Sequence, residues 1–219
     1  MENKRKYLSI VEHYEKCFDK YGDTHCGVDW PKEEDVVTRH KVMLDLINLD
    51  RNRPEAPSLL DFGCGLGHFN DFLLKQKEKI QYSGLDISQK FIGHCKEKYN
   101  SNTFYCEDVL SDSSHIPMFD YIIMNGVFTE KRELSNDEMT SYMFRILSTL
   151  FNKCAHGMAF NVMSKLVEWE REDLFHIPFN VITDYLYKNL TRNFVIRHDY
   201  GLYEYTVYLY KNPTIAIIV

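Results

Sequence analysis

Apolar and polar residues follow different patterns before and after Pro57. Before it, residues 4–20 and 33–49 carry apolar side chains at helical spacing, which predicts two amphipathic helices. After it, short apolar runs alternate with amphipathic stretches, an order typical of βαβ units around a parallel sheet. The predicted strands are 58–62, 80–86, 103–106, 119–124, 156–163, 193–198 and 203–211, and the predicted helices between them are 67–78, 89–99, 135–152 and 178–190.

The last two predicted strands have no helix between them. A turn near Gly201 joins them as a hairpin, so the final strand should run antiparallel to the others. Tyrosines alternate along this hairpin at 200, 203, 205, 208 and 210, which predicts that about half of them face the core and half face water. We therefore expect an α/β fold with a doubly wound, seven-stranded sheet, mostly parallel with an antiparallel last strand. Residues 1–57 are expected to form a helical extension and lid, and residues 58–219 a single compact domain.

The length of the chain indicates the number of domains, and its charge indicates which classes of partner to expect. The chain has 219 residues, 44% of them hydrophobic, which suits one sizeable core rather than two ordinary domains with a linker. Its formal charge of -6 argues against a surface that follows a phosphate backbone, so nucleic acid is not expected as a partner. The apolar stretches are too short to span a bilayer, and the first residues lack the apolar region of a secretory signal, so we expect a cytoplasmic protein without membrane contact. The six cysteines include no CxxC pair and are expected to be reduced thiols.

The segment 58–69 carries the most informative chemistry. An apolar strand runs into Gly63, Gly65 and Gly67 and then into a helix, so a ligand can approach the backbone and meet free N–H groups. Such a loop can also be only a tight strand-to-helix turn. Asp86, at the end of the second strand, favours a binding site, because a carboxylate there meets the ribose in doubly wound sheets. The alternative is that it caps the following helix.

Two further acids indicate the kind of cofactor. Asp108 follows the third strand, where it can accept from an adenine amino group while the N–H of Val109 meets a ring nitrogen; the alternative is a solvated loop acid. Asp61 precedes the glycines, whose spacing is Gly-x-Gly-x-Gly rather than Gly-x-Gly-x-x-Gly. That carboxylate would repel a pyrophosphate and attract a cationic cofactor with an amino group. A nicotinamide enzyme is therefore a minor alternative.

Four segments in this order resemble class I S-adenosylmethionine (SAM) dependent methyltransferases: 59–67, 84–88, 107–109 and 119–125. The resemblance covers about residues 58–211. It implies a Rossmann-like fold with an extra antiparallel strand, SAM as cofactor and S-adenosylhomocysteine (SAH) as product. The resemblance implies that Asp61, Gly63 and Gly65 line the methionine end, Asp86 holds the ribose, Asp108 faces the adenine and Asn125 borders the transferable methyl group. Gly67, Ile87 and Val109 complete the predicted set of cofactor-binding residues.

The whole chain also resembles a small group of uncharacterised methyltransferases associated with bacterial surface-polysaccharide gene clusters. This second resemblance rests on segments 22–25, 27–31 and 124–134. The fourth strand lacks the Asn/Asp-Pro-Pro-Tyr signature of methyltransferases that act on planar exocyclic amines. This absence argues against DNA bases and glutamine amides as acceptors. No clustered set of acids indicates a Mg²⁺ site, so no metal is expected.

Three segments at the expected carboxyl edge of the sheet offer groups for an acceptor. The first contains His25 as a candidate base and Trp30 as an apolar wall of the lid, or else as an indole that plugs the core. The second contains Phe128, which we expect against the cofactor. Its charged neighbours, Glu130 and Arg132, face either the acceptor or only solvent before the next helix.

The third segment, residues 161–176, concentrates polar and aromatic groups in an expected loop. Asn161 offers a hydrogen bond to a sugar hydroxyl, Trp169 a stacking face, Arg171 an anion site and His176 a base, although a structural histidine is the more common case. Tyr203, near the hairpin turn, is a further candidate for substrate contact.

The leading hypothesis is a cytoplasmic SAM-dependent methyltransferase that acts on a small molecule, most plausibly by O-methylation of a sugar or sugar nucleotide in polysaccharide biosynthesis. N-methylation of an amino sugar, methylation of a protein side chain and a SAM-binding protein without turnover stay open as alternatives. His176, Asn125 and His25 are the catalytic candidates, and none of them is singled out as the base. The sequence predicts neither an oligomeric state nor whether residues 21–31 become ordered on cofactor binding.

Overall fold

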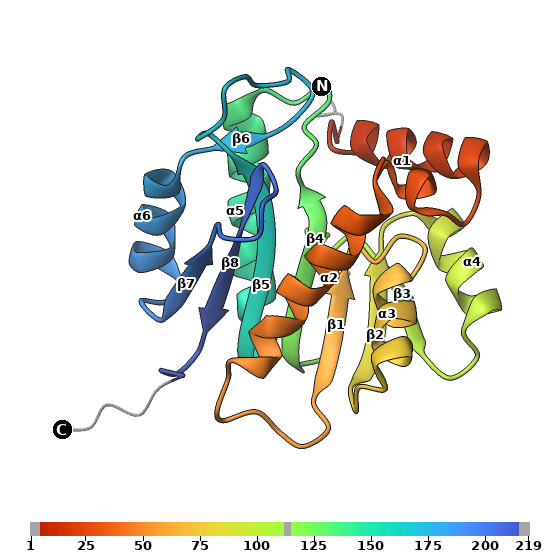
Figure 1. The fold of residues 1–219 in the computed structure, drawn as a ribbon, viewed down its shortest axis with the longest axis horizontal. Coiled ribbons are helices and arrows are strands. Elements are labelled where there is room, and N and C mark those ends of the chain that lie inside the picture. The colour runs from red at the N-terminus through yellow and green to blue at the C-terminus, as the bar shows by residue number, and fades with distance from the viewer. Residues whose placement is uncertain (1–4, 112–114, 215–219) are drawn as a thin grey trace.

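The computed structural model describes residues 5–111 and 115–214, which fold around one central sheet (Figure 1). The strands are β1 (Ser58–Phe62), β2 (Gln81–Asp86), β3 (Thr103–Cys106), β4 (Phe119–Phe128), β5 (Cys154–Ser164), β6 (His176–Ile177), β7 (Phe194–Arg197) and β8 (Glu204–Tyr210). The helices are α1 (Leu8–Tyr21), the short 3-10 helix η1 (His25–Val28), α2 (Glu33–Asn48), α3 (His68–Gln76), α4 (Gln89–Lys98), α5 (Asn136–Phe151) and α6 (Phe179–Asn189). The first predicted helix thus begins at Leu8, and residue 4, its predicted start, lies outside the described residues.

The strand order confirms the predicted fold class. The sheet follows the path β3-β2-β1-β4-β5-β8-β7, so consecutive strands spread in both directions from β1. Strands β1 to β5 pair in parallel, whereas β8 runs antiparallel to both β5 and β7. The predicted antiparallel last strand is therefore present, and it sits inside the sheet between two other strands.

Two details of the strands differ from the prediction. The sequence predicts seven strands, and β6 is an additional one that pairs in parallel with the end of β5, through Met163 and His176. Its length of two residues is too short for any periodicity to show. Strand β4 also continues past its predicted end at 124, because a register shift between Met124 and Phe128 lets it resume pairing with β5.

Helices cover both faces of the sheet. Helices α2, α3 and α4 contribute to one apolar cluster, and α5 and α6 contribute to the cluster on the opposite face. The tyrosines of β8 alternate between these clusters, with Tyr205 on one face and Tyr208 and Tyr210 on the other. The prediction that half of the hairpin tyrosines face water is wrong for β8, because an inner strand covered by two helical layers is buried throughout.

The N-terminal helices differ in how they meet the sheet. Helix α2 is held against β8, because the hydroxyl of Tyr208 donates to the carbonyl of Val42 and that of Tyr210 donates to the carbonyl of Leu46. Helix α1 lies across the end of the sheet to which the arrowheads of β1 and β4 point (Figure 1). No helix in the described part of the chain is long and apolar enough to cross a membrane.

Candidate functional site

A pocket lies at the carboxyl ends of β1, β2, β3 and β4, where α1 covers the sheet edge. Strands β1 and β4 are neighbours here, while their connections leave toward opposite faces, and such switch points form the ligand crevice of open α/β sheets. The pocket brings together most of the residues predicted for the cofactor and one predicted for the substrate. These lining residues are Asp61, Gly63, Gly65, Asp86, Ile87, Asp108, Val109, Asn125 and Trp30.

The turn after β1 depends on residues without a side chain. Gly63 has a φ of +73° and Gly65 a φ of +51°, both in the left-handed region that favours glycine. A Cβ atom on Gly63 would lie 2.6 Å from Cγ2 of Val127, which itself lines the pocket. Gly67 precedes α3 and lies outside the lining; a Cβ atom there would lie 2.6 Å from the ring of Tyr99. Gly63 and Gly65 therefore shape the pocket wall, and Gly67 shapes the turn behind it.

Asp86 ends β2 as a buried carboxylate in the pocket. One oxygen accepts from the backbone N–H of Gly65 at 3.0 Å and the other from that of Ser88 at 2.8 Å. The side chain of Ser88 caps α4 by accepting from the N–H of Phe91, so Asp86 is not needed for that cap. Burial raises the pKa of Asp86 to about 6, although the hydrogen bonds from Ser88 and Gly65 oppose the shift.

Asp61 lies beside it at the end of β1 and is 3% exposed. The hydroxyl of Tyr82 donates to its Oδ2 atom at 2.9 Å. Burial raises the pKa of Asp61 to about 7, and the neighbouring Asp86 adds to that rise. Two buried acids that hold protons this strongly favour a cationic ligand, because a nearby positive charge stabilises their ionised forms.

Asp108 lies where the lid helix meets the loop after β3. Its Oδ2 accepts from the hydroxyl of Tyr7 at 2.6 Å and from Arg5 at 3.1 Å, and its Oδ1 accepts from the N–H of Leu110 at 3.0 Å. The ring of Tyr7 stacks on Tyr142 of α5 with 4.9 Å between centroids, and both rings line the pocket. An aromatic pair that the sequence pattern does not identify thus borders the predicted adenine position.

Asn125 and Trp30 lie together at the end of the pocket formed by β4. The Oδ1 atom of Asn125 is buried and has no hydrogen-bond partner among the described residues. Trp30 packs on the neighbouring Gly126, since a Cβ atom there would lie 3.2 Å from its ring. The carbonyl of Trp30 is 2.5 Å from Nδ1 of His25, and Oδ1 of Asn161 accepts from the N–H of Gly126 at 2.7 Å. His25 and Asn161 lie outside the lining, where they hold residues that do line the pocket.

The other predicted substrate residues lie outside the pocket lining. Phe128 is fully buried in the core, whereas Trp169 and Tyr203 are 62% and 63% exposed. Arg171 pairs with Asp173, with 3.0 Å between Nε and Oδ1. The segment after β5 therefore supplies none of the pocket lining.

His176, a catalytic candidate, is buried in β6 and lies outside the lining. Its Nδ1 atom is 2.7 Å from the carbonyl of Ser164, and its Nε2 atom has no partner in the described part of the chain. The histidine that does line the pocket is His40 of α2, packed against Phe69 and Trp30. Burial lowers the pKa of His40 to about 3, so its imidazole is neutral at physiological pH. A histidine on the buried face of a helix gave no signal in the sequence.

The lid helix supplies lining residues that the sequence did not reveal. Ile10, Val11 and Tyr14 of α1 face into the pocket, and Val28 of η1 joins them. The apolar pattern of residues 4–20 predicts that one face of this helix is covered. It does not indicate that this face covers a ligand pocket, since that depends on where α1 docks.

Comparison with known proteins agrees with this geometry. Residues 60–148, which include the glycine turn, Asp61, Asp86, Asp108 and Asn125, match the family model described as a methyltransferase domain. A protein of Mycobacterium tuberculosis that is provisionally named a methyltransferase is 24% identical to this chain over 165 residues, which are 73% of this chain and 96% of that protein.

Solved structures resemble the fold of nearly the whole chain and not only of residues 60–148. Magnesium protoporphyrin IX methyltransferase from Synechocystis PCC 6803, solved with bound SAM, has a TM-score of 0.64 and 16% identity, and the match covers 97% of this chain and 100% of that chain. The plantazolicin methyltransferase BpumL, solved with SAH, has a TM-score of 0.58 and 14% identity, over 96% of this chain and 91% of that chain. The chain therefore has the Rossmann-like fold of these two methyltransferases. These findings support a SAM-dependent methyltransferase with SAM as its cofactor.

Proposed function

We propose that the protein is a cytoplasmic SAM-dependent methyltransferase that acts on a small polar acceptor. The observation that carries this proposal is the pocket, in which Asp61, Asp86, Asp108 and Asn125 come together from the ends of four adjacent strands. The glycine turn after β1 completes the same wall. Strands β3, β2 and β1 are neighbours in this order, so Asp108, Asp86 and Asp61 follow the order of the adenine, ribose and methionine parts of the cofactor.

The pocket fits SAM group by group. Asp86 presents acceptor oxygens for the two ribose hydroxyls, and Asp108 presents them for the adenine amino group. The raised pKa of Asp61 suits a neighbouring ammonium group, and the missing Cβ atom at Gly63 lets Val127 of the pocket wall pack close to the turn. When bound, SAM supplies an electrophilic methyl group on a positively charged sulfur atom.

The residues of this chain contribute alignment of the acceptor and exclusion of water. Ile10, Val11 and Tyr14 of the lid cover the pocket and keep water from the reacting groups. The unpartnered Oδ1 of Asn125 accepts a hydrogen bond from a hydroxyl or amino group and so orients the lone pair of the acceptor. His40 lies in the same lining, but burial lowers its pKa to about 3, so its imidazole is a poor acceptor for the proton of a hydroxyl and we do not assign it as the base.

The acceptor that we favour is a hydroxyl group of a sugar or sugar nucleotide in polysaccharide biosynthesis. The acceptor atom of Asn125 supports a hydroxyl or amino donor, and the resemblance to polysaccharide-cluster methyltransferases supports a sugar. An amino sugar would be methylated in the same position without a base. With either acceptor, Trp169, Arg171 and Tyr203 lie outside the pocket lining and would contact only a part of the acceptor that extends beyond the pocket.

A matched pair of tryptophan variants tests the function and the place of the acceptor. The wild-type protein is expected to transfer the methyl group of labelled SAM to members of a panel of sugars, sugar nucleotides, amino sugars and peptides, and mass spectrometry identifies the product. Trp30→Phe, inside the pocket, is expected to lower kcat/KM by about tenfold or more, because the wall beside Asn125 loses contact area. Trp169→Phe, on the exposed loop, should change it by less than about twofold. SAM binding without turnover on any acceptor would contradict an enzyme and favour a SAM-binding protein.

SAM binding is also expected to release protons near neutral pH. The ammonium group of the ligand beside Asp61 lowers a pKa that stands at about 7 in the free protein, so the complex holds fewer protons. Calorimetric titration at pH 7 in two buffers of different ionisation enthalpy should give on the order of half a proton released per SAM, and affinity should rise as pH increases through 7. Asp61→Asn should remove most of this release. Proton uptake on binding would contradict the assignment of Asp61.

A further inference from the structure

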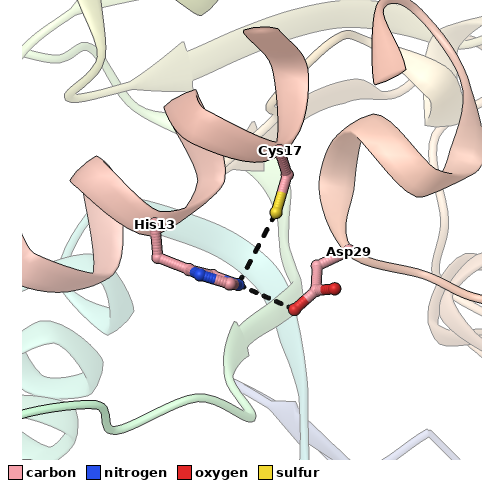
Figure 2. A group of neighbouring side chains, drawn as sticks. All are labelled: His13, Cys17 and Asp29. Carbon is pink, nitrogen blue, oxygen red and sulfur yellow. Dashed lines mark hydrogen bonds and ion pairs between the residues drawn. The ribbon is translucent and has the colours of Figure 1, made fainter. Parts of the chain in front are cut away.

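A compact group of metal-ligand side chains lies on the lid, outside the pocket lining. His13 and Cys17 are one helical turn apart on α1, and Asp29 follows η1 in a left-handed conformation with a φ of 57°. Figure 2 shows the three side chains pointing toward one another from these two elements. Nε2 of His13 lies 2.7 Å from Oδ2 of Asp29 and 3.7 Å from Sγ of Cys17, and all three donor atoms lie within 4.8 Å of one another.

We propose that His13, Cys17 and Asp29 form a zinc-type metal site that joins the lid helix to the loop after it. Imidazole nitrogen, thiolate sulfur and carboxylate oxygen are the donors that Zn²⁺ prefers, and three protein ligands leave a fourth position for water. With bonds of about 2.0–2.3 Å, tetrahedral donors lie roughly 3.3–3.8 Å apart. The sulfur–nitrogen distance already fits this range. The nitrogen–oxygen distance must open by about 0.7 Å, which the 39% exposed side chain of Asp29 has room to do.

The guanidinium of Arg132 already places a positive charge beside His13 and Asp29. Nη2 of Arg132 contacts Nε2 of His13 and lies 3.3 Å from Oδ2 of Asp29. The same guanidinium also pairs with Glu130, at 2.8 Å from Nε, and with Asp173, at 3.6 Å from Nη1. Three carboxylates thus share Arg132. If Nη2 withdraws, the guanidinium keeps Glu130 and Asp173 while a metal ion takes over His13 and Asp29, so neither cation nor carboxylate is left unpaired.

The position of the site links metal binding to the pocket. The side chains of His13 and Asp29 are 24% and 39% exposed, so an ion can reach them from solvent. Asp29 precedes Trp30, which lines the pocket, and α1 carries the lining residues Val11 and Tyr14. A metal ion here cross-links the lid to the segment that positions Trp30. Metal binding itself does not depend on the proposed transferase activity.

Cobalt titration of tag-free, chelator-treated protein tests this site. Co²⁺ is expected to bind with one equivalent per chain and to produce a near-ultraviolet thiolate-to-metal charge-transfer band that added Zn²⁺ removes. Cys17→Ser should abolish the band. His13→Gln and Asp29→Asn should each weaken Zn²⁺ binding, measured by calorimetry, by about tenfold or more.

Cys106→Ser is the matched control, because Cys106 is an exposed thiol away from this group and its loss should leave the band and the stoichiometry unchanged. Circular dichroism checks that each variant is folded. Absence of the band in wild-type protein, or a band that persists in Cys17→Ser, would overturn the proposal. SAM titration of the same samples separates that result from any failure of the cofactor site.

Discussion

Replacing Asp86 with alanine is expected to abolish measurable SAM binding. The variant removes the acceptor for both ribose hydroxyls, and hydrogen bonds to a charged group contribute about 1.5–3 kcal/mol each. Two of them correspond to a loss of affinity of about 10²- to 10⁴-fold. The backbone N–H of Gly65 also loses its acceptor, which loosens the glycine turn. Calorimetric titration with SAM, SAH and NAD measures the change and compares the cofactor classes.

Two further variants separate binding from folding. Asp86→Asn keeps the size of the side chain but loses the charge, and it should retain part of the affinity. Asp184→Ala removes an acid whose side chain is 73% exposed and which pairs with Lys188 one turn away, so SAM should bind as tightly as to the wild type. Undiminished binding by a folded Asp86→Ala protein would refute the ribose assignment, and binding of NAD alone would refute the cofactor class.

The fold was largely predictable because its signals are local. Each main strand is a contiguous apolar run, and the strand–helix alternation allows few topologies. What escaped prediction depends on partners distant in sequence. Strand β6 pairs with the end of β5, where His176 lies opposite Met163, and β8 is buried on both faces because it is an inner strand with apolar clusters on both sides of the sheet. Neither feature can be predicted from the residues of the strand alone.

The residues of the site also divide into those with a local signal in the sequence and those placed by contacts with distant segments. Asp61, Asp86, Asp108 and Asn125 were predictable since each lies at or just after the carboxyl end of a predicted strand, and parallel strands bring these ends to one edge. Lid and helix residues such as Tyr7, Tyr14 and His40 were not, because their place in the pocket follows from the docking of α1 and α2. The segment 161–176 was expected to build the acceptor wall, but it lies outside the lining, and its last residue, His176, pairs with Met163 of β5.

Alanine at Gly63 is expected to lower both stability and SAM affinity. The φ of +73° is costly for any residue with a Cβ atom, about 1–2 kcal/mol, and that atom would lie 2.6 Å from Val127 Cγ2. Displacement of Val127 moves a pocket wall as well as the turn, so SAM affinity should fall by about 100-fold or more, measured by calorimetry. Urea unfolding should show a loss of stability of about 1–3 kcal/mol.

Alanine at Gly93 is the matched change with the opposite expected sign. Gly93 lies within α4, where an added Cβ atom meets nothing within 4 Å, so Gly93→Ala should stabilise the protein by about 0.5–1 kcal/mol and leave SAM binding unaltered. The same added methyl group thus has opposite effects at two glycines, because only one of them stands in left-handed backbone against the pocket wall. SAM affinity of Gly63→Ala within about threefold of the wild type would show that the turn tolerates a side chain, and the glycine turn would then no longer support the cofactor site.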